Sequence, residues 1–147
     1  MSRPQKQTVD YFPHDCVQGK TLFIIQRLFS NDGYAVLFKL LELLGQTEGH
    51  YLNIRSEDAA EYLWAYLDVI PKKGNQILDK LSALEFIDAE LWNGRVIWCQ
   101  NFINNLTDVY SRRVVLVPDK PPLDVILQQE SRLNGINGDK NPQSKVN

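Results

Sequence analysis

The apolar and polar positions of the chain predict a row of short helices followed by one tight hairpin. Within 19–29, apolar residues at 22, 25, 28 and 29 have the spacing of a helix face, and the polar run at 30–33 indicates a turn. The next segment, about 33–46, is apolar on all sides except for a narrow stripe of Lys39, Glu42 and Gln46. A helix with so little polar surface is typical of the centre of a small hydrophobic core.

Two further helices are predicted close together in the middle of the chain. After a short β-type run at 49–54, Ser56 is a suitable N-cap for a helix over 57–67. Pro71 fits the first turn of a second helix that ends near 84. Each segment has apolar residues at helical spacing along one face, so both helices are expected to pack on a common core. A last helix is expected over 101–113, ending in Arg112 and Arg113.

The stretch from Phe86 to Trp98, FIDAELWNGRVIW, has two alternating apolar runs joined by Asn93-Gly94. Asn-Gly between such runs is a strong hairpin signal, because a type I′ turn needs positive φ at both central residues. A two-residue loop predicts an inward face made of Ile87, Ala89, Leu91, Val96 and Trp98. The outward face would then carry Asp88, Glu90, Trp92, Arg95 and Ile97.

This order of helices and strands predicts a mostly α fold of the winged helix-turn-helix type. Helices 57–67 and 71–84 would form the helix-turn-helix, and the hairpin would form the wing. The run at 50–54 could add a third strand, which makes a small β-hairpin or three-stranded sheet. The domain is expected to cover 1–113, with an N-terminal arm over 1–15 anchored by Tyr11-Phe12-Pro13. Residues 114–147 are expected to form an extended tail or linker with a short helix near 123–133, stopped by Asn134-Gly135.

Four segments of the chain resemble one family. These are RPQKQTVDYFPHD at the start, GYAVLFKLLELL in the core helix, LEFIDAELW before the turn and NPQSKVN at the end. They are similar to a domain of unknown function at the N-terminus of phage- and prophage-type, DnaD-like replication proteins. The resemblance covers about residues 3–113, and the short segment NPQSKVN extends it into the tail. It implies a winged-helix domain placed before a variable C-terminal part, and more loosely a role in DNA replication.

Composition and charge exclude several classes of protein. Hydrophobic residues make up 44% and charged residues 23%, and the net charge is −2, so no strong global field attracts nucleic acid. Cys16 and Cys99 lack the spacing of a metal cluster. The start of the chain lacks the apolar core of a signal peptide, and no run is long enough to cross a membrane. We therefore expect a cytoplasmic protein without a membrane segment.

Enzymatic motifs are incomplete. Gly19-Lys20-Thr21 has the ending of a phosphate-binding P-loop, but His14 stands where the earlier glycine is required. His14, Asp15 and Cys16 are adjacent in the chain, and adjacent side chains rarely converge as a nucleophile and its base. We therefore expect no catalytic activity, no cofactor and no metal site.

The second helix of a helix-turn-helix normally lies in the DNA major groove, with its N-terminal residues at the base edges. Here that helix begins PKKGNQILDK. Lysines suit phosphate oxygens, whereas Asn and Gln can bond an adenine edge in two places. With the tip of the wing added, the candidate DNA-binding residues are Lys72, Lys73, Asn75, Gln76, Lys80, Asn93 and Arg95.

These residues also have alternative interpretations that involve no DNA contact. The lysines could form a solvated helix end, and Arg95 could stack on Trp92 as a surface cation–π pair. From 70 to 99 the count is four basic residues (Lys72, Lys73, Lys80, Arg95) against four acidic ones (Asp79, Glu85, Asp88, Glu90). Any DNA binding by this domain alone should therefore be weak and sensitive to salt.

The competing hypothesis is a protein-interaction or dimerisation module without direct DNA contact. An exposed Trp92 beside Ile97 would make a small apolar patch, and Arg3 and Lys6 on the arm would be free to contribute. The apolar run at 114–117 could pair with a sheet edge, in the same subunit or in a partner. Replication proteins or a second copy of the chain would be the partners. The sequence leaves both hypotheses open.

Overall fold

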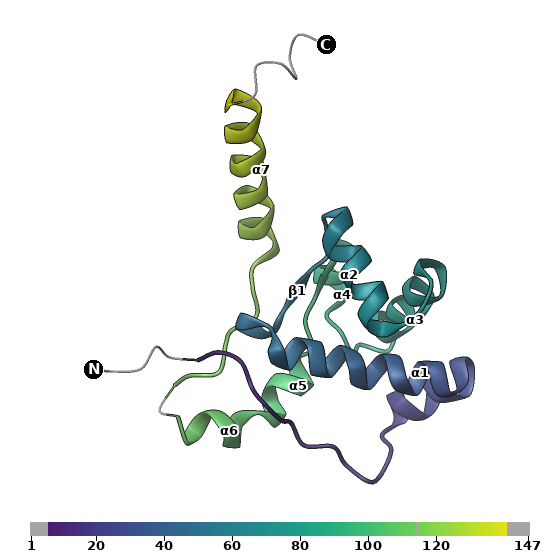
Figure 1. Cartoon of the computed structure of the whole chain (residues 1–147). Helices are drawn as coiled ribbons and strands as arrows, with labels where there is room; N and C mark the ends of the chain where they lie inside the picture. The colour runs from purple at the N-terminus through teal and green to yellow at the C-terminus, as the bar shows by residue number, and fades with distance from the viewer. Residues whose placement is uncertain (1–5, 114, 141–147) are drawn as a thin grey trace.

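The structure is a computed structural model, which describes residues 6–113 and 115–140, with side chains as far as Asn134. It is mostly helical and contains a two-stranded antiparallel sheet (Figure 1). In chain order the elements are α1 (Lys20–Gln46), the 3-10 helix η1 (Glu48–His50), β1 (Leu52–Asn53), α2 (Glu57–Leu67), α3 (Pro71–Ala83), α4 (Ala89–Asn93), β2 (Val96–Ile97), α5 (Gln100–Asn105), α6 (Thr107–Ser111) and α7 (Leu123–Lys140). The mostly helical class with a small sheet is confirmed.

Helix α1 joins the two helices predicted at 19–29 and 33–46, with a kink between them. Ser30 takes φ 57° and ψ −145°, a non-helical conformation that interrupts the helix at the predicted turn. Gly33 lies in the bend, where an added Cβ would be 2.6 Å from the carbonyl oxygen of Ile25. After the kink, α1 buries Val36, Leu37, Leu40, Leu41, Leu43 and Leu44. The predicted central core helix is confirmed.

Helices α2 and α3 begin where their caps predict. The Ser56 side chain accepts a hydrogen bond from the N–H of Ala59, 3.1 Å away. Helix α2 ends at Leu67 and is followed by its C-cap Asp68, which takes a left-handed conformation. Pro71 occupies the first turn of α3. The two helices approach closely because Gly74 lies against Trp64, and a Cβ at Gly74 would overlap the ring of Trp64.

The hairpin predicted over Phe86–Trp98 is wrong. Residues 89–93 form helix α4, so the predicted pairs across an Asn93-Gly94 turn do not exist. The Asp88 side chain caps this helix by accepting a hydrogen bond from the N–H of Leu91 at 2.9 Å. A local cap of this kind competes directly with strand formation. Ala89, predicted to face inward, is exposed.

A positive φ was predicted for Asn93 and Gly94, but in the structure it occurs at Arg95. Gly94 takes φ −89°, whereas Arg95 takes φ 64° and directs the chain into β2. Strand β2 then pairs with β1 instead of with 86–92, placing Leu52 opposite Ile97 and the next residue opposite Val96. The described residues contain no third strand. The predicted inward positions Ile87, Leu91, Val96 and Trp98 are nevertheless all buried.

The segment after α6 packs onto the domain. Residues 115–117 form no strand, so the predicted pairing of this run with a sheet edge is absent among them. Lys120 bonds Asp88 at 2.9 Å, and Ile126 is only 6% exposed in the main core. The helix that follows, α7, does not stop at Asn134 as predicted but runs on to Lys140, rising away from the body (Figure 1).

The N-terminal arm is docked along α1. Val9 is buried, and its N–H donates to the carbonyl oxygen of Gly45 at 2.8 Å. Phe12 packs edge-on against Phe102, as expected for an anchor, whereas Tyr11 is 61% exposed. Lys6 is paired with Asp10 at 3.1 Å and so is not free as predicted. Arg3 lies outside the described residues.

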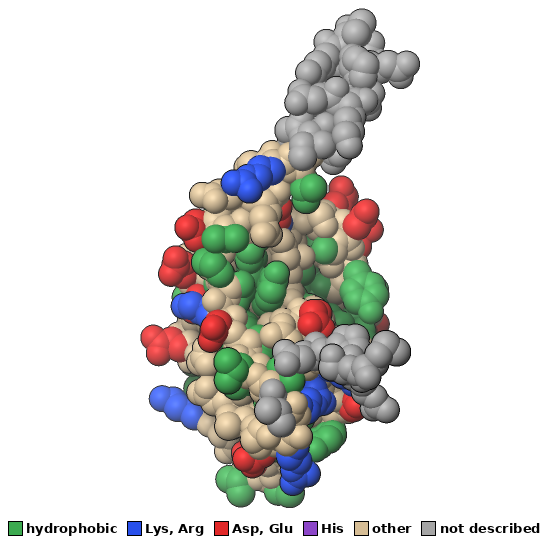
Figure 2. Space-filling model, turned by 90° about the vertical axis from the view of Figure 1, so that its left-hand side faces the viewer, with side chains coloured by type: hydrophobic (Ala, Val, Ile, Leu, Met, Phe, Trp, Pro, Cys, Tyr) green, Lys and Arg blue, Asp and Glu red, His purple; other side chains and the backbone are tan. Residues whose placement is uncertain are grey.

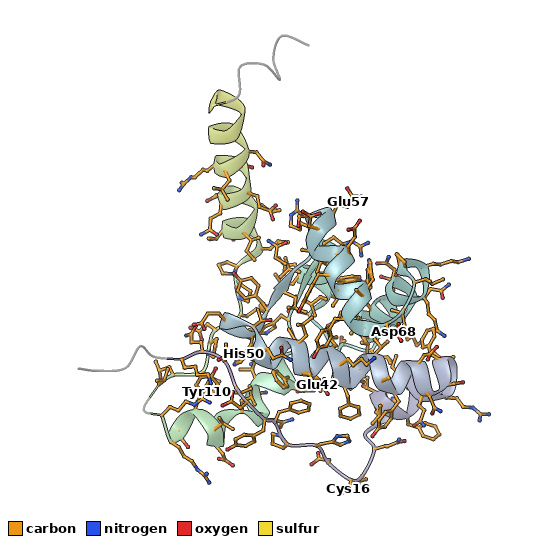
Figure 3. All side chains as sticks on the ribbon, viewed as in Figure 1. Cys16, Glu42, His50, Glu57, Asp68 and Tyr110 are labelled. Atoms are coloured by element: carbon orange, nitrogen blue, oxygen red, sulfur yellow. The ribbon has the colours of Figure 1, made fainter. Side chains whose placement is uncertain are left out.

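A buried histidine joins the end of α1 to α6. His50 is fully buried, its Nδ1 lies 2.8 Å from the carbonyl oxygen of Leu44, and its Nε2 lies 2.5 Å from the hydroxyl of Tyr110 (Figure 3). A carbonyl oxygen can only accept, so Nδ1 carries the proton. In the neutral ring Nε2 then accepts the hydrogen bond from the tyrosine. Burial lowers the pKa of His50 below its ordinary value of 6.5, against the opposing effect of the hydrogen bond to Leu44.

We predict that Gly74→Ala destabilises the fold by about 1–3 kcal/mol, because the new methyl group overpacks Trp64 and separates α2 from α3. The matched control is Gly19→Ala, at a position where an added Cβ has no atom within 4 Å. Urea unfolding of both variants is the measurement. Equal stability of the two would contradict the close approach of α2 and α3.

We predict that the free energy of unfolding decreases as the pH falls below about 6.5. The unfolded chain takes up a proton on His50 at its ordinary pKa of 6.5, whereas the folded state holds that pKa lower, so the unfolded state binds more protons in this window. The slope from one group is at most about 1.4 kcal/mol per pH unit. Urea unfolding at pH 7.5 and 5.5 measures it.

His50→Gln should remove this contribution, and His14→Gln is the control that should keep it. In a separate variant, Tyr110→Phe leaves Nε2 buried without a donor and should destabilise the fold by about 1–3 kcal/mol at neutral pH. A pH dependence that is the same in His50→Gln and in the natural chain would refute the role of this histidine.

Candidate nucleic-acid interface

The exposed side of α3 carries a row of polar residues one helical turn apart. Lys72 and Gln76 are exposed, and Lys80 is partly exposed, at positions i, i+4 and i+8. The opposite side of the helix buries Ile77, Leu78 and Leu81, which fixes the direction in which this row points. The first turn of α3 contains no acidic residue. We call Lys72, Gln76 and Lys80 the α3 row.

Two other residues predicted for DNA contact are held by the protein itself. Lys73 forms an ion pair with Asp32 of α1, with Nζ and Oδ2 2.5 Å apart. The Asn75 side chain folds back along its helix and donates to the carbonyl oxygen of Pro71 at 3.0 Å. Its Oδ1 is buried and has no hydrogen-bond partner among the described residues. In this state Asn75 is not positioned to bond a base edge in two places.

The predicted apolar surface patch does not exist. Trp92 is 4% exposed and Ile97 is fully buried, because the short helix α4 and the β1–β2 pairing turn both side chains into the core. The indole N–H of Trp92 donates to the carboxylate of Asp79 at 2.8 Å. This hydrogen bond occupies an oxygen of an acidic side chain of α3.

The residues expected at the wing tip lie at the end of α4 and just after it. Asn93 is exposed. Arg95 is exposed too, with its guanidinium 4.6 Å from the centre of the Trp92 ring, which matches the cation–π alternative. The adjacent Gly94 is covered by Leu123 of α7, and its carbonyl oxygen accepts a hydrogen bond from Arg55 at 3.0 Å. The C-terminal helix therefore crowds one side of this tip.

The basic residues at the end of α6 lie far from the α3 row. Helix α6 and the described start of the arm occupy one end of the molecule, and α3 lies at the other (Figure 1). Arg113 is engaged there, because it donates to the backbone oxygen of Thr8 at 2.5 Å and lies over the Tyr110 ring. Arg112 is exposed. The structure does not bring these residues together with Lys72 and Lys80.

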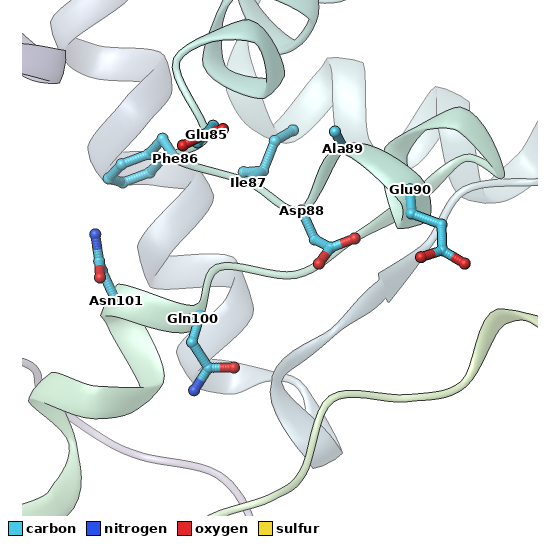
Figure 4. A pocket seen from close by; sticks show the side chains of 8 residues that line it. All are labelled: Glu85, Phe86, Ile87, Asp88, Ala89, Glu90, Gln100 and Asn101. Atoms are coloured by element: carbon cyan, nitrogen blue, oxygen red, sulfur yellow. The ribbon is translucent and has the colours of Figure 1, made fainter.

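A cavity of about 350 Å³ lies between the start of α4 and the start of α5, lined by Glu85, Asp88, Glu90, Gln100 and Asn101 among others (Figure 4). Asp88 already serves as the cap of α4 and as the partner of Lys120. Burial raises the pKa of Asp88, but the hydrogen bonds from Leu91 and Lys120 outweigh it and leave the pKa below its ordinary value. Its structural bonds explain this carboxylate without a bound ligand.

The described residues offer neither a metal site nor a membrane-spanning helix. No group of three or more His, Cys, Asp or Glu side chains is placed to hold a metal ion in this part of the chain. No helix formed by the described residues is both long enough and apolar enough to span a membrane.

No sequence pattern pointed to two carboxylates, Asp32 and Glu130, that decide which cations are available. Asp32 pairs with Lys73, and Glu130 pairs with Arg55 at 2.7 Å while accepting from Asn53 at 2.9 Å. These partners are 41 and 75 positions apart in the chain, so no local spacing rule connects them. The sequence marks Asp32 only as part of a polar turn.

Comparison with known proteins identifies the family. The family described as Lin1244/Lin1753-like, N-terminal, matches residues 11–102, which is more than half of the chain. The protein therefore belongs to this family. The matched range includes the arm from Tyr11, all of α1 to α4 and the first residues of α5. It excludes the tail motif NPQSKVN. Neither the curated proteins nor the solved structures contain a significant match.

We predict that Asp79→Ala destabilises the fold by about 1–3 kcal/mol, because the indole N–H of Trp92 loses its acceptor in a buried position. Asp79→Asn keeps an oxygen acceptor and should lose less than half as much. Urea unfolding followed by tryptophan fluorescence measures both. If Trp92 instead stood on an exposed wing, neither substitution would change the stability.

Proposed function

We propose that this Lin1244/Lin1753-like domain is a non-catalytic DNA-binding or assembly domain of a phage-type, DnaD-like replication protein. In this proposal α2 and α3 act as a helix-turn-helix, and α3 contacts DNA. The observation that carries the proposal is the α3 row, an outward-facing line of two lysines and a glutamine that runs from the first to the last turn of the second helix of a tightly packed pair.

The chemistry of the α3 row supports phosphate contact. The positive end of a helix dipole disfavours Lys72 by a few tenths of a kcal/mol, and a phosphate placed there would remove that cost. None of the ion pairs between described residues involves Lys72 or Lys80. Gln76 lies between them and has the amide group needed to bond an adenine edge. In the proposed complex Lys72 and Lys80 contact phosphates, and Gln76 faces the bases.

In this proposal Lys73 can contact DNA only after its ion pair with Asp32 opens. Its partner Asp32 has a side chain that is 61% exposed, so the pair is accessible to solvent and its strength depends on salt. A DNA phosphate near the start of α3 would compete with Asp32 for the ammonium group. The neutralising carboxylate makes binding weaker than the number of lysines suggests.

The second candidate function is assembly without DNA contact. It is favoured by the acidic composition, with a pI of about 5.7, and by the ion pairs that neutralise Lys73 and Arg55. Arg95 is also consistent with assembly, since its stacking on Trp92 explains its position without any contact to a DNA minor groove.

A fluorescence-anisotropy titration with labelled duplex and single-stranded DNA at two salt concentrations tests the proposal. We expect saturable binding to duplex DNA that weakens with salt. Lys72→Glu and Lys80→Glu should each reduce the affinity about tenfold and flatten the salt dependence. Asp32→Asn should increase the affinity, because it frees Lys73 and removes one negative charge beside it.

The matched control is Arg112→Glu, an identical charge change on an exposed residue at the other end of the molecule. If Arg112→Glu weakens binding as much as Lys72→Glu, the effect comes from net charge and the assignment to α3 is wrong. Absence of binding at low salt refutes the DNA proposal for this chain and leaves the assembly function.

A further inference from the structure

An apolar groove lies on the face of the molecule below α7. Its cavity of about 300 Å³ is lined by residues of the end of α1, of β1 with its flanks, and of α2. The floor contains Tyr51, Leu52 and Ile54, and the wall on α2 contains Leu63 and the 61% exposed Tyr62. Figure 2 shows hydrophobic side chains gathered in a hollow of this face, with acidic side chains around it.

An acidic residue of α2 lies at the rim of the groove. Asp58 is exposed one helical turn before the lining residue Tyr62, whereas the exposed Glu57 and Glu61 point to the other side of the helix. The groove therefore suits an occupant with an apolar side chain and a neighbouring positive charge.

Helix α7 carries such a pair on its free half. Along one face of α7, Leu123, Ile126, Glu130 and Leu133 follow each other at spacings of three, four and three residues. The first three are used within the chain: Leu123 covers Gly94, Ile126 is buried, and Glu130 bonds Asn53 and Arg55. The fourth, Leu133, is 60% exposed, and Arg132 beside it is exposed as well.

The helix cannot fill the groove of its own subunit. The hydrogen bonds from Asn53 and Arg55 hold Glu130 at the edge of β1, and beyond that point α7 leads away from the body (Figure 1). As far as Asn134, where the described side chains end, no residue of α7 lines the groove. The apolar face of α7 therefore continues past the domain that covers its first half.

We propose that the free half of α7 docks into this groove of a second copy of the chain. Leu133 enters the cavity between β1 and α2 of the other copy, and Arg132 faces Asp58 at its rim. The contact is reciprocal, because each copy offers one helix and one groove, which is the arrangement of a twofold symmetric dimer. The dimer does not depend on DNA and is tested in its absence.

Sedimentation of the full chain over about 1–300 µM, a range that spans micromolar dissociation constants, measures the proposed dimer. We expect the natural chain to dimerise with rising concentration. Leu133→Asp and Tyr62→Glu should each weaken dimerisation at least about tenfold, since each places a charge in the apolar contact. The matched control is Ser131→Asp, which adds the same charge on the opposite face of α7 and should leave the dimer intact.

Mixing the two defective variants tests the reciprocal geometry. The Leu133→Asp chain keeps its groove and the Tyr62→Glu chain keeps its helix, so the mixture retains one complete contact. We expect a heterodimer that is weaker than the natural dimer and tighter than either variant alone. A natural chain that stays monomeric over the whole range overturns the proposal, as does a dimer that is unaffected by both Leu133→Asp and Tyr62→Glu.

Discussion

The burial of α1 after its kink is the constraint on which the rest of the structure depends. This part of the helix is apolar on nearly every side, so neighbours must cover it on several faces at once. Helices α2 and α3 pack on it, the N-terminal arm bonds to it at Gly45, and His50 ties its end to Tyr110 of α6 (Figure 3). Because these partners come from both ends of the chain, arm, helix pair and α6 form one cooperative core.

The same architecture sets the pattern of available charge. Lys73, Arg55 and Lys120 are each paired with a carboxylate from a distant segment. What remains on α3 is the row of Lys72, Gln76 and Lys80, which faces solvent because the opposite side of the helix is buried. The proposed DNA contact and the proposed dimer use different surfaces, since the groove under α7 is bordered by α2 and β1.

The candidate site was only partly predictable from the sequence. Lys72, Gln76 and Lys80 follow from helical spacing, because the buried face of α3 decides which residues point outward. The states of Lys73 and Asn75 could not be predicted: the first depends on Asp32 across a long sequence separation, and the second on a choice between solvent and its own helix backbone. Trp92 was misplaced because its direction followed from a hairpin that does not form.

The sequence by itself determined the elements whose signals are local and mutually consistent. Ser56 and Pro71 set the starts of α2 and α3, and the apolar spacing set their buried faces. Between Phe86 and Trp98 the local signals conflict, since Asn93-Gly94 favours a turn and Asp88 favours a helix cap. Only the tertiary structure decided between them. Pairing β2 with β1 buries Ile97, and helix α4 places the indole of Trp92 against Asp79. Both contacts join segments that no local sequence pattern relates.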